Sequence, residues 1–324
     1  MIQLFQRQEI ERVIRLDTEV VNVVEDAFSA LITKNVHMPP IMRVDIPTNN
    51  GEVDIKSAYI EGDDSFAVKL SSGFFNNPQK GLPSANGMMI LLSAETGVPK
   101  AVLADNGLLT DIRTAAAGAV AARYCSREDS HTAGIIGTGA QARLQLQALT
   151  LVRPIEQVLV YGRRTERAEE FKQDIQNVLG LNVSVCESPQ EVVQKSDIVV
   201  TTTPSKEPIV RAEWLHPGLH ITAMGSDAEH KQELDCKVIE QADVFVCDVI
   251  EQSKRLGELR NCPSYSIEKA IELGEITSGS QQGRLTNEQV TVCDLSGTGV
   301  QDTAIARHVY SLLVSKEETI HERR

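Results

Sequence analysis

The sequence predicts an α/β protein that combines a Rossmann-type doubly wound parallel sheet with a second, α+β domain. Three observations lead to this prediction. From residue 131 onward, apolar strand-like runs alternate with helix-like segments, an order typical of a parallel sheet with helices on both faces. Residues 41–104 instead hold neighbouring strand-like pieces separated by Gly, Pro, Asn and Asp, which favour an antiparallel sheet. The length, 324 residues, is enough for two domains.

Composition limits the classes of partner. The formal charge of −13 would repel both the phosphate backbone of a nucleic acid and an anionic membrane surface. No apolar run approaches the roughly 18 residues that a bilayer-spanning helix needs. The first residues, MIQLFQRQEIERVI, lack the basic start, apolar middle and small-residue cleavage site of a secretory signal. We therefore expect a cytoplasmic protein that binds neither nucleic acid nor membrane.

The cysteines and histidines give no sign of a metal site. Six cysteines lie far apart with no C-x-x-C pair, so we expect reduced, mostly structural thiols and neither a zinc site nor a dense disulfide framework. The seven histidines include no helical pair with a partnering acid, because Pro217-Gly218 separates His216 from His220. We expect no metal.

The N-terminal part of the chain is predicted to mix helices with strands. Residues 18–34 place apolar side chains three and four positions apart, which predicts an amphipathic helix. Residues 111–124 (DIRTAAAGAVAARY) are rich in alanine and begin with an acid, which predicts a helix leading into the next domain. The strand-like pieces between these helices are IMRVDIP, VDIKSAYI, SFAVKLSS, GMMILLSAETG and PKAVLAD.

The second half alternates regularly. The predicted strands TAGIIG, QVLVYG, NVSVC and DIVVTTT are separated by the predicted helices AQARLQLQAL, ERAEEFKQDIQNVL and SPQEVVQKS. Later predicted strands are HITAMG, DVFVCD and VTVCDL. The segment QDTAIARHVYSLLV is predicted to be a helix that returns to the first domain, and residues 317–324 are predicted to be a polar tail.

One glycine-rich turn indicates dinucleotide binding. It follows the pattern G-x-G-x-x-(G/A), after a strand and at the start of a helix, where the first glycine permits a tight turn and the second lets the backbone approach a pyrophosphate. The helix N-terminus then offers unpaired N–H groups to the phosphates. The alternative is a glycine turn that serves packing alone. The residues of this turn are Gly137, Thr138, Gly139, Ala140, Gln141 and Ala142.

The next predicted strand ends in residues that bear on cofactor choice. An NAD site usually has Asp or Glu at this place to hold the ribose hydroxyls, whereas arginine pairs with a 2′-phosphate. Here the sequence has Arg163, Arg164 and Thr165, so it favours NADP(H) over NAD(H), unless these arginines are ordinary solvated turn residues. Thr202 and Thr203, at the end of DIVVTTT, complete this part of the predicted cofactor set.

Several motifs together resemble one family. The segments PPIMRV, FAVKLSSGF, GLPSANGMMILLSAETG, DNGLLTDIRTAAAGAVAA, GIIGTGAQA, GSDAEHKQEL and GTGVQD occur in the order found in the ornithine cyclodeaminase/mu-crystallin family. This family includes ornithine and lysine cyclodeaminases, an alanine dehydrogenase, cyclic ketimine reductases and a hormone-binding crystallin. The resemblance covers nearly the whole chain.

The resemblance implies a domain organisation. Residues 1–113 with 306–324 would form a substrate-binding and dimerisation domain, and residues 114–305 would form an NAD(P)-binding Rossmann domain inserted into it. Members are typically homodimers, so a homodimer with a small-molecule substrate is expected.

The resemblance also implies roles for individual residues. Arg43, Lys69 and Arg113 would converge on the substrate carboxylate, which suits a guanidinium fork and an ammonium. Asp227 would be the catalytic acid/base beside the nicotinamide, although such an Asp could merely cap the next helix. We count Lys69 with Asp227 as catalytic. The loop near the nicotinamide ring would hold Gly297, Thr298, Gly299 and Val300, whereas Gln301 and Asp302 could simply begin the last helix.

Lys56 marks a departure from the family pattern. Ornithine-type enzymes place a glutamate at about this position to receive the distal amine of the substrate, whereas this strand has Lys56, with Asp54 on the same face. A cation there would repel a distal ammonium by about 1 kcal/mol at 4 Å in water, and by more in a drier site. It would favour a distal carboxylate, as in the iminosuccinate/aspartate pair. Alternatively, Lys56 points to solvent on an edge strand.

The resemblance implies three candidate functions. The leading one is an NAD(P)H-dependent reductase of a small α-imino carboxylate, either iminosuccinate-like or a cyclic ketimine, reversible as an amino-acid dehydrogenase. The stretches VDIKSAYI and SSGFFNNPQKGLPS are also similar to a subgroup named for ectoine utilisation, often labelled cyclodeaminases. The alternatives are therefore an ornithine-type cyclodeaminase that releases ammonia, and a non-catalytic, crystallin-like binding protein.

Overall fold

The computed structural model describes residues 2–321, with side chains up to residue 316. The chain divides into two compact units: the first unit is residues 1–113 with 298–324, and the second unit is residues 114–297. The second domain boundary predicted from sequence, between residues 305 and 306, falls inside α10 (Gly299–His321), because that helix is continuous. Residues 317–321 of the predicted polar tail continue this helix, and residues 322–324 lie outside the described part.

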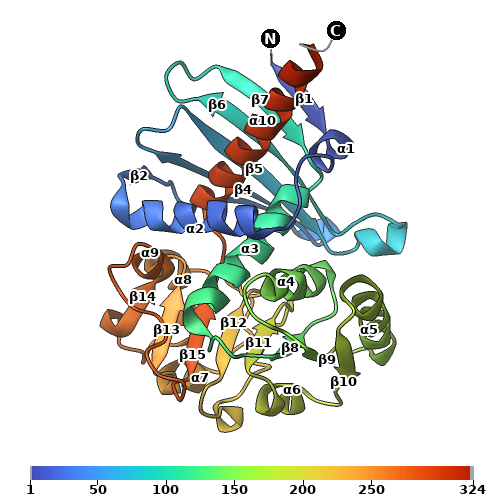
Figure 1. The fold of residues 1–324 in the computed structure, drawn as a ribbon, viewed down its shortest axis with the longest axis vertical. Helices are drawn as coiled ribbons and strands as arrows, with labels where there is room; N and C mark the ends of the chain where they lie inside the picture. The colour runs from blue at the N-terminus through green and yellow to red at the C-terminus, as the bar shows by residue number, and fades with distance from the viewer. Residues whose placement is uncertain (1, 322–324) are drawn as a thin grey trace. The chain divides into compact units, whose positions relative to one another are not determined.

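The first unit is built around a seven-stranded sheet. The strand order is β1-β7-β6-β5-β4-β2, and β3 also pairs with β4. The predicted antiparallel meander is confirmed for β3 to β7, while β1 adds to β7 in parallel. Figure 1 shows α10 lying along this sheet with α2 crossing it. The strands are β1 (Gln3–Gln6), β2 (Val36–His37), β3 (Met42–Ile46), β4 (Gly51–Ile60), β5 (Ser65–Phe74), β6 (Ala85–Ser93) and β7 (Pro99–Ala104).

The two faces of this sheet differ. Side chains alternate along each strand, so Ala58, Ala67 and Leu91 lie on one face, fully buried beneath α10 and α2. The other face is also apolar but stays exposed, with Leu4 58% and Met42 54% accessible. The helices that begin in this unit are α1 (Arg7–Ile10), α2 (Thr18–Thr33), α3 (Leu108–Cys125) and α10.

The second unit is a doubly wound sheet. All of its strand pairs are parallel, in the order β10-β9-β8-β11-β12-β15-β13-β14, which confirms the predicted fold class. The strands are β8 (Thr132–Ile136), β9 (Gln157–Tyr161), β10 (Asn182–Val185), β11 (Ile198–Thr201), β12 (His220–Ala223), β13 (Val244–Cys247), β14 (Ala270–Glu272) and β15 (Thr291–Asp294). The helices are α4 (Ala140–Thr150), α5 (Thr165–Leu179), α6 (Pro189–Lys195), α7 (Cys236–Gln241), α8 (Ile250–Ser253) and α9 (Leu273–Thr277).

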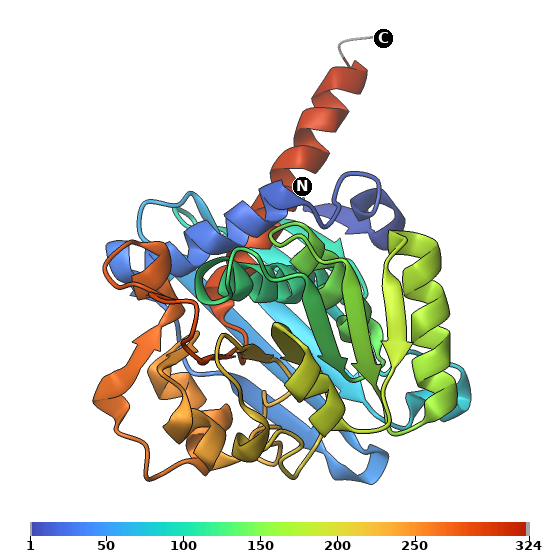
Figure 2. The ribbon, with the colours of Figure 1, turned by 60° about the horizontal axis from the view of Figure 1, so that its bottom comes forward.

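Both faces of this sheet carry an apolar core, which explains the near-continuous apolar strands. On β8, Ile135 joins one core and Ile136 the other, as period-two alternation requires. The first core includes residues of α4 and α5, which Figure 2 shows flanking β8 to β10, and the second includes residues of α6 and α7. No helix of the described residues is long and apolar enough to cross a membrane.

The expectation that all cysteines are reduced is wrong for one pair. Cys236, at the start of α7, and Cys262 form a disulfide across 26 residues of sequence. No spacing motif signals it, because the fold brings the two Cα atoms to within 4.9 Å. Glu240 lies close to both sulfurs, but disulfide sulfurs have no thiolate to offer a metal. The other four cysteines are buried thiols.

Candidate active site

The glycine turn has the local geometry that dinucleotide binding requires. Gly137 has φ +125°, and a Cβ there would lie 2.4 Å from Oγ1 of Thr202, so only glycine fits. Gly139 precedes α4, and a Cβ there would meet nothing within 4 Å, which leaves open space above the helix N-terminus. Ala142 is fully buried where α4 packs on the sheet. The turn therefore combines a tight bend with an open approach to the first N–H groups of α4.

The strand order also suits a dinucleotide. The chain reverses its direction of winding between β8 and β11, and ligands of open α/β sheets bind at the carboxyl ends of strands around such a point. The turn follows β8, and Thr202 follows β11. Oγ1 of Thr202 is buried and has no hydrogen-bond partner within the described residues, as expected for a polar atom that serves a ligand. The residues of this edge fit a nicotinamide dinucleotide.

Arg163 and Arg164 lie next to this turn. They follow β9 and Gly162, where a Cβ would lie 2.6 Å from Cγ2 of Thr138. Both arginines are exposed, as is Thr165, and neither forms an ion pair with another described residue. Sequence reasoning missed Arg143, whose Nη1 donates to the carbonyls of Thr138 and Gly139 at 2.7 and 3.2 Å and so braces the turn.

Asp227 lies in the segment that follows β12. Its carboxylate accepts a hydrogen bond from Nζ of Lys231 at 2.5 Å, and its side chain is 49% exposed. Asp227 is thus a solvent-accessible carboxylate at the carboxyl edge of the sheet, which is where the sequence predicted an acid/base.

A buried carboxylate supports this edge, and sequence reasoning missed it. Glu233 accepts hydrogen bonds from Oγ1 of Thr201 at 2.6 Å, from N and Oγ1 of Thr203 at 2.6 and 2.8 Å, and from N of Gly225 at 2.7 Å. It thereby ties the end of β11 to the backbone two residues before Asp227. Burial raises the pKa of Glu233, although its donors oppose this. Its signal in the sequence is its place in GSDAEHKQEL, one of the segments that resemble the family.

Three more buried carboxylates extend this support. Glu258 accepts from the backbone N–H groups of Glu233 and Leu234 at 2.8 and 3.2 Å. Asp294 accepts from N of Glu258 at 2.9 Å, and burial raises its pKa to about 7. Asp248 accepts from the N–H groups of Ser296 and Gly297 at 2.8 and 2.6 Å, which fixes the turn at Gly297, where φ is +81°.

The first unit brings Lys69 and Arg113 together, as predicted. Both are buried, and both contact Asp302: Nζ of Lys69 lies 2.9 Å from Oδ1, and so does Nε of Arg113. Nη1 of Arg113 also donates to Oε1 of Gln301 at 3.0 Å. Burial raises the pKa of Asp302, but Lys69 and Arg113 outweigh it and lower the pKa overall. Asp302 therefore acts as a shared counter-ion and does not merely begin the last helix.

Lys56 joins this group. It pairs directly with Lys69 across β4 and β5, so both side chains lie on the same face of the sheet. Lys56 is only 8% exposed, and β4 is an interior strand, so the alternative of a solvent-facing lysine on an edge strand is wrong. Burial, followed by the charge of Arg113, lowers the pKa of Lys69 to about 7. We call Lys56, Lys69, Arg113 and Asp302 the cationic cradle.

Arg43 is not joined to the cradle by any contact among the described residues. It lies on the neighbouring strand β3, where it pairs in register with Asp54. Its guanidinium contacts Asp45 at 2.9 Å, Asp54 at 3.6 Å and also Glu52. Burial lowers its pKa, but these three carboxylates outweigh burial and raise it overall. A substrate carboxylate would have to compete with them, so the predicted role of Arg43 stays a prediction that this geometry does not favour.

The GTGVQD segment divides differently from the prediction. Gly299 begins α10, and a Cβ there would lie 2.4 Å from the carbonyl of Ser57, so this glycine lets the helix start against β4. The Val300 side chain is fully buried in an apolar cluster with residues of α2 and β4. Thr298 is buried, and its N–H donates to Gln301 at 3.3 Å. Packing thus occupies the side chain of Val300, and its predicted cofactor contact is not supported.

The chain matches the model of the ornithine cyclodeaminase/mu-crystallin family over residues 2–317. It belongs to this family. A relative described as a putative dehydrogenase from Rhizobium meliloti is 51% identical over 309 residues, which is 94% of each chain. The resemblance recognised in the sequence is therefore confirmed, and with it membership in a family whose curated members include dehydrogenases and reductases.

Three solved structures cover nearly the whole chain. The Δ1-pyrroline-2-carboxylate reductase of Thermococcus litoralis, in complex with NADH and L-proline, has a TM-score of 0.92 and 31% identity, and the match covers 98% of both chains. An archaeal alanine dehydrogenase dimer with bound NAD has a TM-score of 0.89 and 35% identity over 98% and 97% of the chains. The iminosuccinate reductase of Paracoccus denitrificans, in complex with NAD+, has a TM-score of 0.89 and 27% identity over the same shares.

Proposed function

We propose that this protein is an NAD(P)H-dependent reductase of a small α-imino dicarboxylate, and that it runs in reverse as an amino-acid dehydrogenase. The observation that carries the proposal is Lys56, a buried lysine directly opposite Lys69. The cradle gathers three basic side chains around one carboxylate, Asp302, which contacts Lys69 and Arg113, and a substrate with two carboxylates would offer acceptors to these basic groups.

The cradle offers two places for carboxylates. Lys69 and Arg113, which share Asp302, are suited to the α-carboxylate, because an ammonium and a guanidinium both form charge-assisted hydrogen bonds to it. Lys56 would take the second carboxylate of the substrate. The distal ammonium of ornithine would instead meet a lysine, and in a desolvated site that repulsion opposes binding.

The proton and the hydride have separate sources. When bound, the nicotinamide dinucleotide supplies the hydride that the imine carbon accepts. Asp227 would deliver the proton to the imine nitrogen, giving the amine, and would accept it back in the oxidative direction. Its contact with Lys231 and its exposure allow it to exchange protons with solvent between turnovers.

The two other candidates share the fold but not this charge pattern. An ornithine-type cyclodeaminase needs a site for a distal ammonium, and Lys56 opposes one. A non-catalytic binding protein has no use for an accessible carboxylate such as Asp227 beside a dinucleotide edge. If Asp227→Asn left ligand binding and biological activity unchanged, the binding-protein alternative would gain.

Cofactor preference follows from the turn after β9. Arg163 and Arg164 have no ion-pair partner among the described residues, which supports NADP(H) through pairing with the 2′-phosphate. The two reductases described above were solved with NADH or NAD+, so the preference for NADP(H) is inferred from the arginines of this chain and not from those structures. Dissociation constants for NADPH and NADH would test it, and tighter NADH would defeat it.

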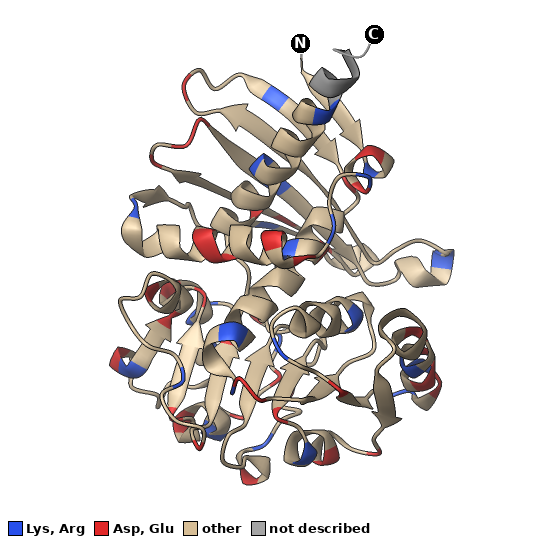
Figure 3. Ribbon diagram, in the orientation of Figure 1, with Lys and Arg blue, Asp and Glu red and all other residues tan. Residues whose placement is uncertain are grey.

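We further propose a homodimer in which the exposed sheet face of the first unit packs against a second copy. This face is apolar along its strands, with Leu4, Met42, Val44 and Met88 at least 41% exposed. The archaeal alanine dehydrogenase is a dimer with the same fold. Figure 3 shows few charged residues along these strands, in contrast to the helices of the second unit. Sedimentation of wild-type protein and of Met88→Glu would test it, because a charge there should yield monomers.

A steady-state assay tests the proposed reaction. Iminosuccinate, a cyclic ketimine and ornithine would be followed at the nicotinamide absorbance, with ammonia measured in parallel. We expect the highest kcat/KM with iminosuccinate. Turnover of ornithine to proline with ammonia release, and no reduction of either imine, would overturn the proposal in favour of the cyclodeaminase.

A further inference from the structure

The second unit contains a cavity that the proposed reaction does not use. Its volume is about 450 Å³, and Arg123, Arg127, Arg153 and Arg284 line it together with Tyr124, Thr286 and Asn287. The lining segments directly precede β8, β9 and β15, so the cavity lies at the amino ends of the sheet. The glycine turn follows β8 at the carboxyl end, and at about 3.3 Å per residue the five-residue strand holds the two sites about 16 Å apart.

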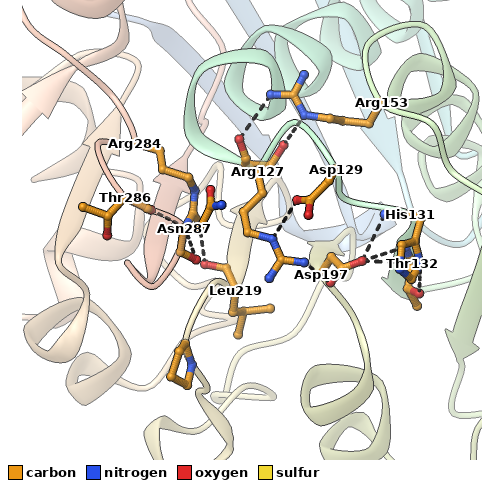
Figure 4. Close-up of polar contacts among 12 residues, drawn as sticks. Arg127, Asp129, His131, Thr132, Arg153, Asp197, Leu219, Arg284, Thr286 and Asn287 are labelled. Atoms are coloured by element: carbon orange, nitrogen blue, oxygen red, sulfur yellow. Dashed lines mark hydrogen bonds and ion pairs between the residues drawn. The ribbon is translucent and has the colours of Figure 1, made fainter.

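Two of the arginines have satisfied hydrogen bonds but no balancing carboxylate. Arg153 donates to the carbonyls of Ala122, Arg123, Val152 and Ser126 and to the Ser126 hydroxyl. Arg284 donates to the carbonyls of Cys125, Thr286, Asn287, Gln289 and Leu219 and to the Thr291 hydroxyl. Figure 4 shows Arg284 beside Leu219, Thr286 and Asn287. Neither forms an ion pair with another described residue, so both positive charges lack a counter-ion in contact.

The surroundings disfavour these charges. Burial lowers the pKa of Arg153, and the charge of Arg123 adds to this effect. Burial likewise lowers the pKa of Arg284, where Arg127 and Arg153 contribute. Glu128 and Asp129 also line the cavity. Asp129 is bound to Arg127, and the charge of Glu128 partly offsets the lowering of the pKa of Arg153. In a protein with a net charge of −13, Arg153 and Arg284 are therefore two positive charges without a carboxylate in contact.

The cavity also presents donors that no described residue uses. In Arg127, Nε donates to Asp129 at 3.1 Å and Nη2 donates to Asp197 at 2.9 Å. Its Nη1 makes no hydrogen bond within the described residues. The same is true there of the Asn287 side-chain amide and the Thr286 hydroxyl. A ligand with several acceptor oxygens could therefore gain hydrogen bonds without displacing the bonds that hold Arg153 and Arg284.

We propose that this cavity is a binding site for a small dianionic oxyanion, either a phosphate monoester or a dicarboxylate. The charge of the ligand would compensate Arg153 and Arg284, and its oxygens would accept from Arg127, Thr286 and Asn287. A dinucleotide at the glycine turn would not compete with it, because the two sites lie at opposite ends of β8. The inference does not depend on the proposed reaction, because binding alone tests it.

Calorimetric titration of inorganic phosphate and of succinate into the full chain saturated with its dinucleotide tests the proposal. The principal variant is Leu285→Glu: Leu285 lines the cavity and is 64% exposed, so the new carboxylate should repel an anion without removing a buried contact. Val178→Glu makes the same change at a residue that is 74% exposed on α5 and does not line the cavity. Arg127→Gln and the surface control Arg167→Gln form a second matched pair.

We expect at least one of the two anions to bind saturably at the cavity, in addition to any succinate that binds at the cradle. The dissociation constant at the cavity should rise at least fivefold in Leu285→Glu and Arg127→Gln and change less than twofold in the two control variants. Tighter phosphate would indicate a phosphate monoester, and tighter succinate a dicarboxylate. The proposal is overturned if neither anion binds saturably, or if the cavity variants bind as the wild type does, since any binding would then belong to another site such as the cradle.

Discussion

Each unit contains a buried group of ionisable side chains, and the two groups differ in how fully other residues of the protein satisfy them. In the cradle, three basic side chains (Lys56, Lys69 and Arg113) lie near the buried carboxylate of Asp302, which contacts Lys69 and Arg113. In the second unit, Glu233 alone accepts four hydrogen bonds from backbone and hydroxyl donors, and Glu258 accepts two more. Charges that their surroundings satisfy act as structural links. Basic groups gathered near one carboxylate indicate where a ligand supplies further acceptors.

The largest expected effect comes from removing a cradle charge. Lys69→Met deletes a substrate contact, and we expect kcat/KM to fall at least about 1,000-fold, which corresponds to about 4 kcal/mol. The free energy of unfolding should change by less than about 2 kcal/mol, because Arg113 still neutralises Asp302 and a buried lysine already carries a desolvation cost. Steady-state kinetics and urea unfolding measure the two effects. A large loss of stability with activity retained would mean that Lys69 is structural.

For Glu233, a buried carboxylate of the second unit, we expect the opposite balance: stability should fall more than for Lys69→Met. Glu233→Gln places an amide NH2 among donors from Thr201, Thr203 and Gly225, so we expect a loss of about 2–3 kcal/mol in the free energy of unfolding. Because these donors hold the segment that carries Asp227, kcat should also fall while dinucleotide affinity changes less. The matched control is Glu229→Gln, an exposed glutamate in the same segment. Unchanged stability would contradict the role of Glu233 as a link.

The pH dependence of stability should have opposite signs in the two groups. The pKa of Asp294 rises from 3.8 to about 7 on folding, so the folded state holds more protons between these values and stability falls as pH rises through them. The pKa of Lys69 falls from 10.5 to about 7, so the unfolded chain holds more protons above pH 7 and stability rises from there towards pH 10.5. Each slope approaches about 1.4 kcal/mol per pH unit for one proton.

Urea unfolding between pH 4 and 10 measures these slopes. Asp294→Asn should remove the fall on the acidic side, and Lys69→Met should remove the rise on the basic side. If each variant kept the pH dependence of the wild type, other groups would account for it.

The sequence predicted those features of the fold and the site that depend on residues close together in the chain. Strand alternation, the glycine turn, Lys69 and Arg113 all lie in motifs or periodic segments. Asp302 and Glu233 were missed because their roles depend on partners distant in the chain: Asp302 is 189 residues from Arg113. The Cys236–Cys262 disulfide was missed for the same reason. Lys56 was identified only through its contrast with the family, and its burial required the sheet register.

Lys56 tests the cradle more selectively than Lys69 does. Lys56→Gln keeps a polar side chain but removes the cation opposite Lys69. We expect kcat/KM for iminosuccinate to fall about 10–100-fold, or about 1.4–2.7 kcal/mol, while reduction of a cyclic ketimine with one carboxylate changes less than threefold. The ratio of the two activities is the measurement. Equal losses of kcat/KM for both substrates would mean that Lys56 does not bind a second substrate carboxylate.

We expect the smallest effect from substituting Arg43, because its contacts in the structure differ from the role that its sequence motif predicts. Its motif predicts a carboxylate ligand, yet the structure surrounds it with Asp45, Glu52 and Asp54. A partly exposed ion-pair group of this kind contributes little, so Arg43→Gln should change kcat/KM less than about threefold and stability by less than about 1 kcal/mol. Loss of activity comparable to that of Lys69→Met would show that a substrate carboxylate displaces these acids. In that case the basic groups available to a substrate on this sheet face would extend beyond the cradle to β3.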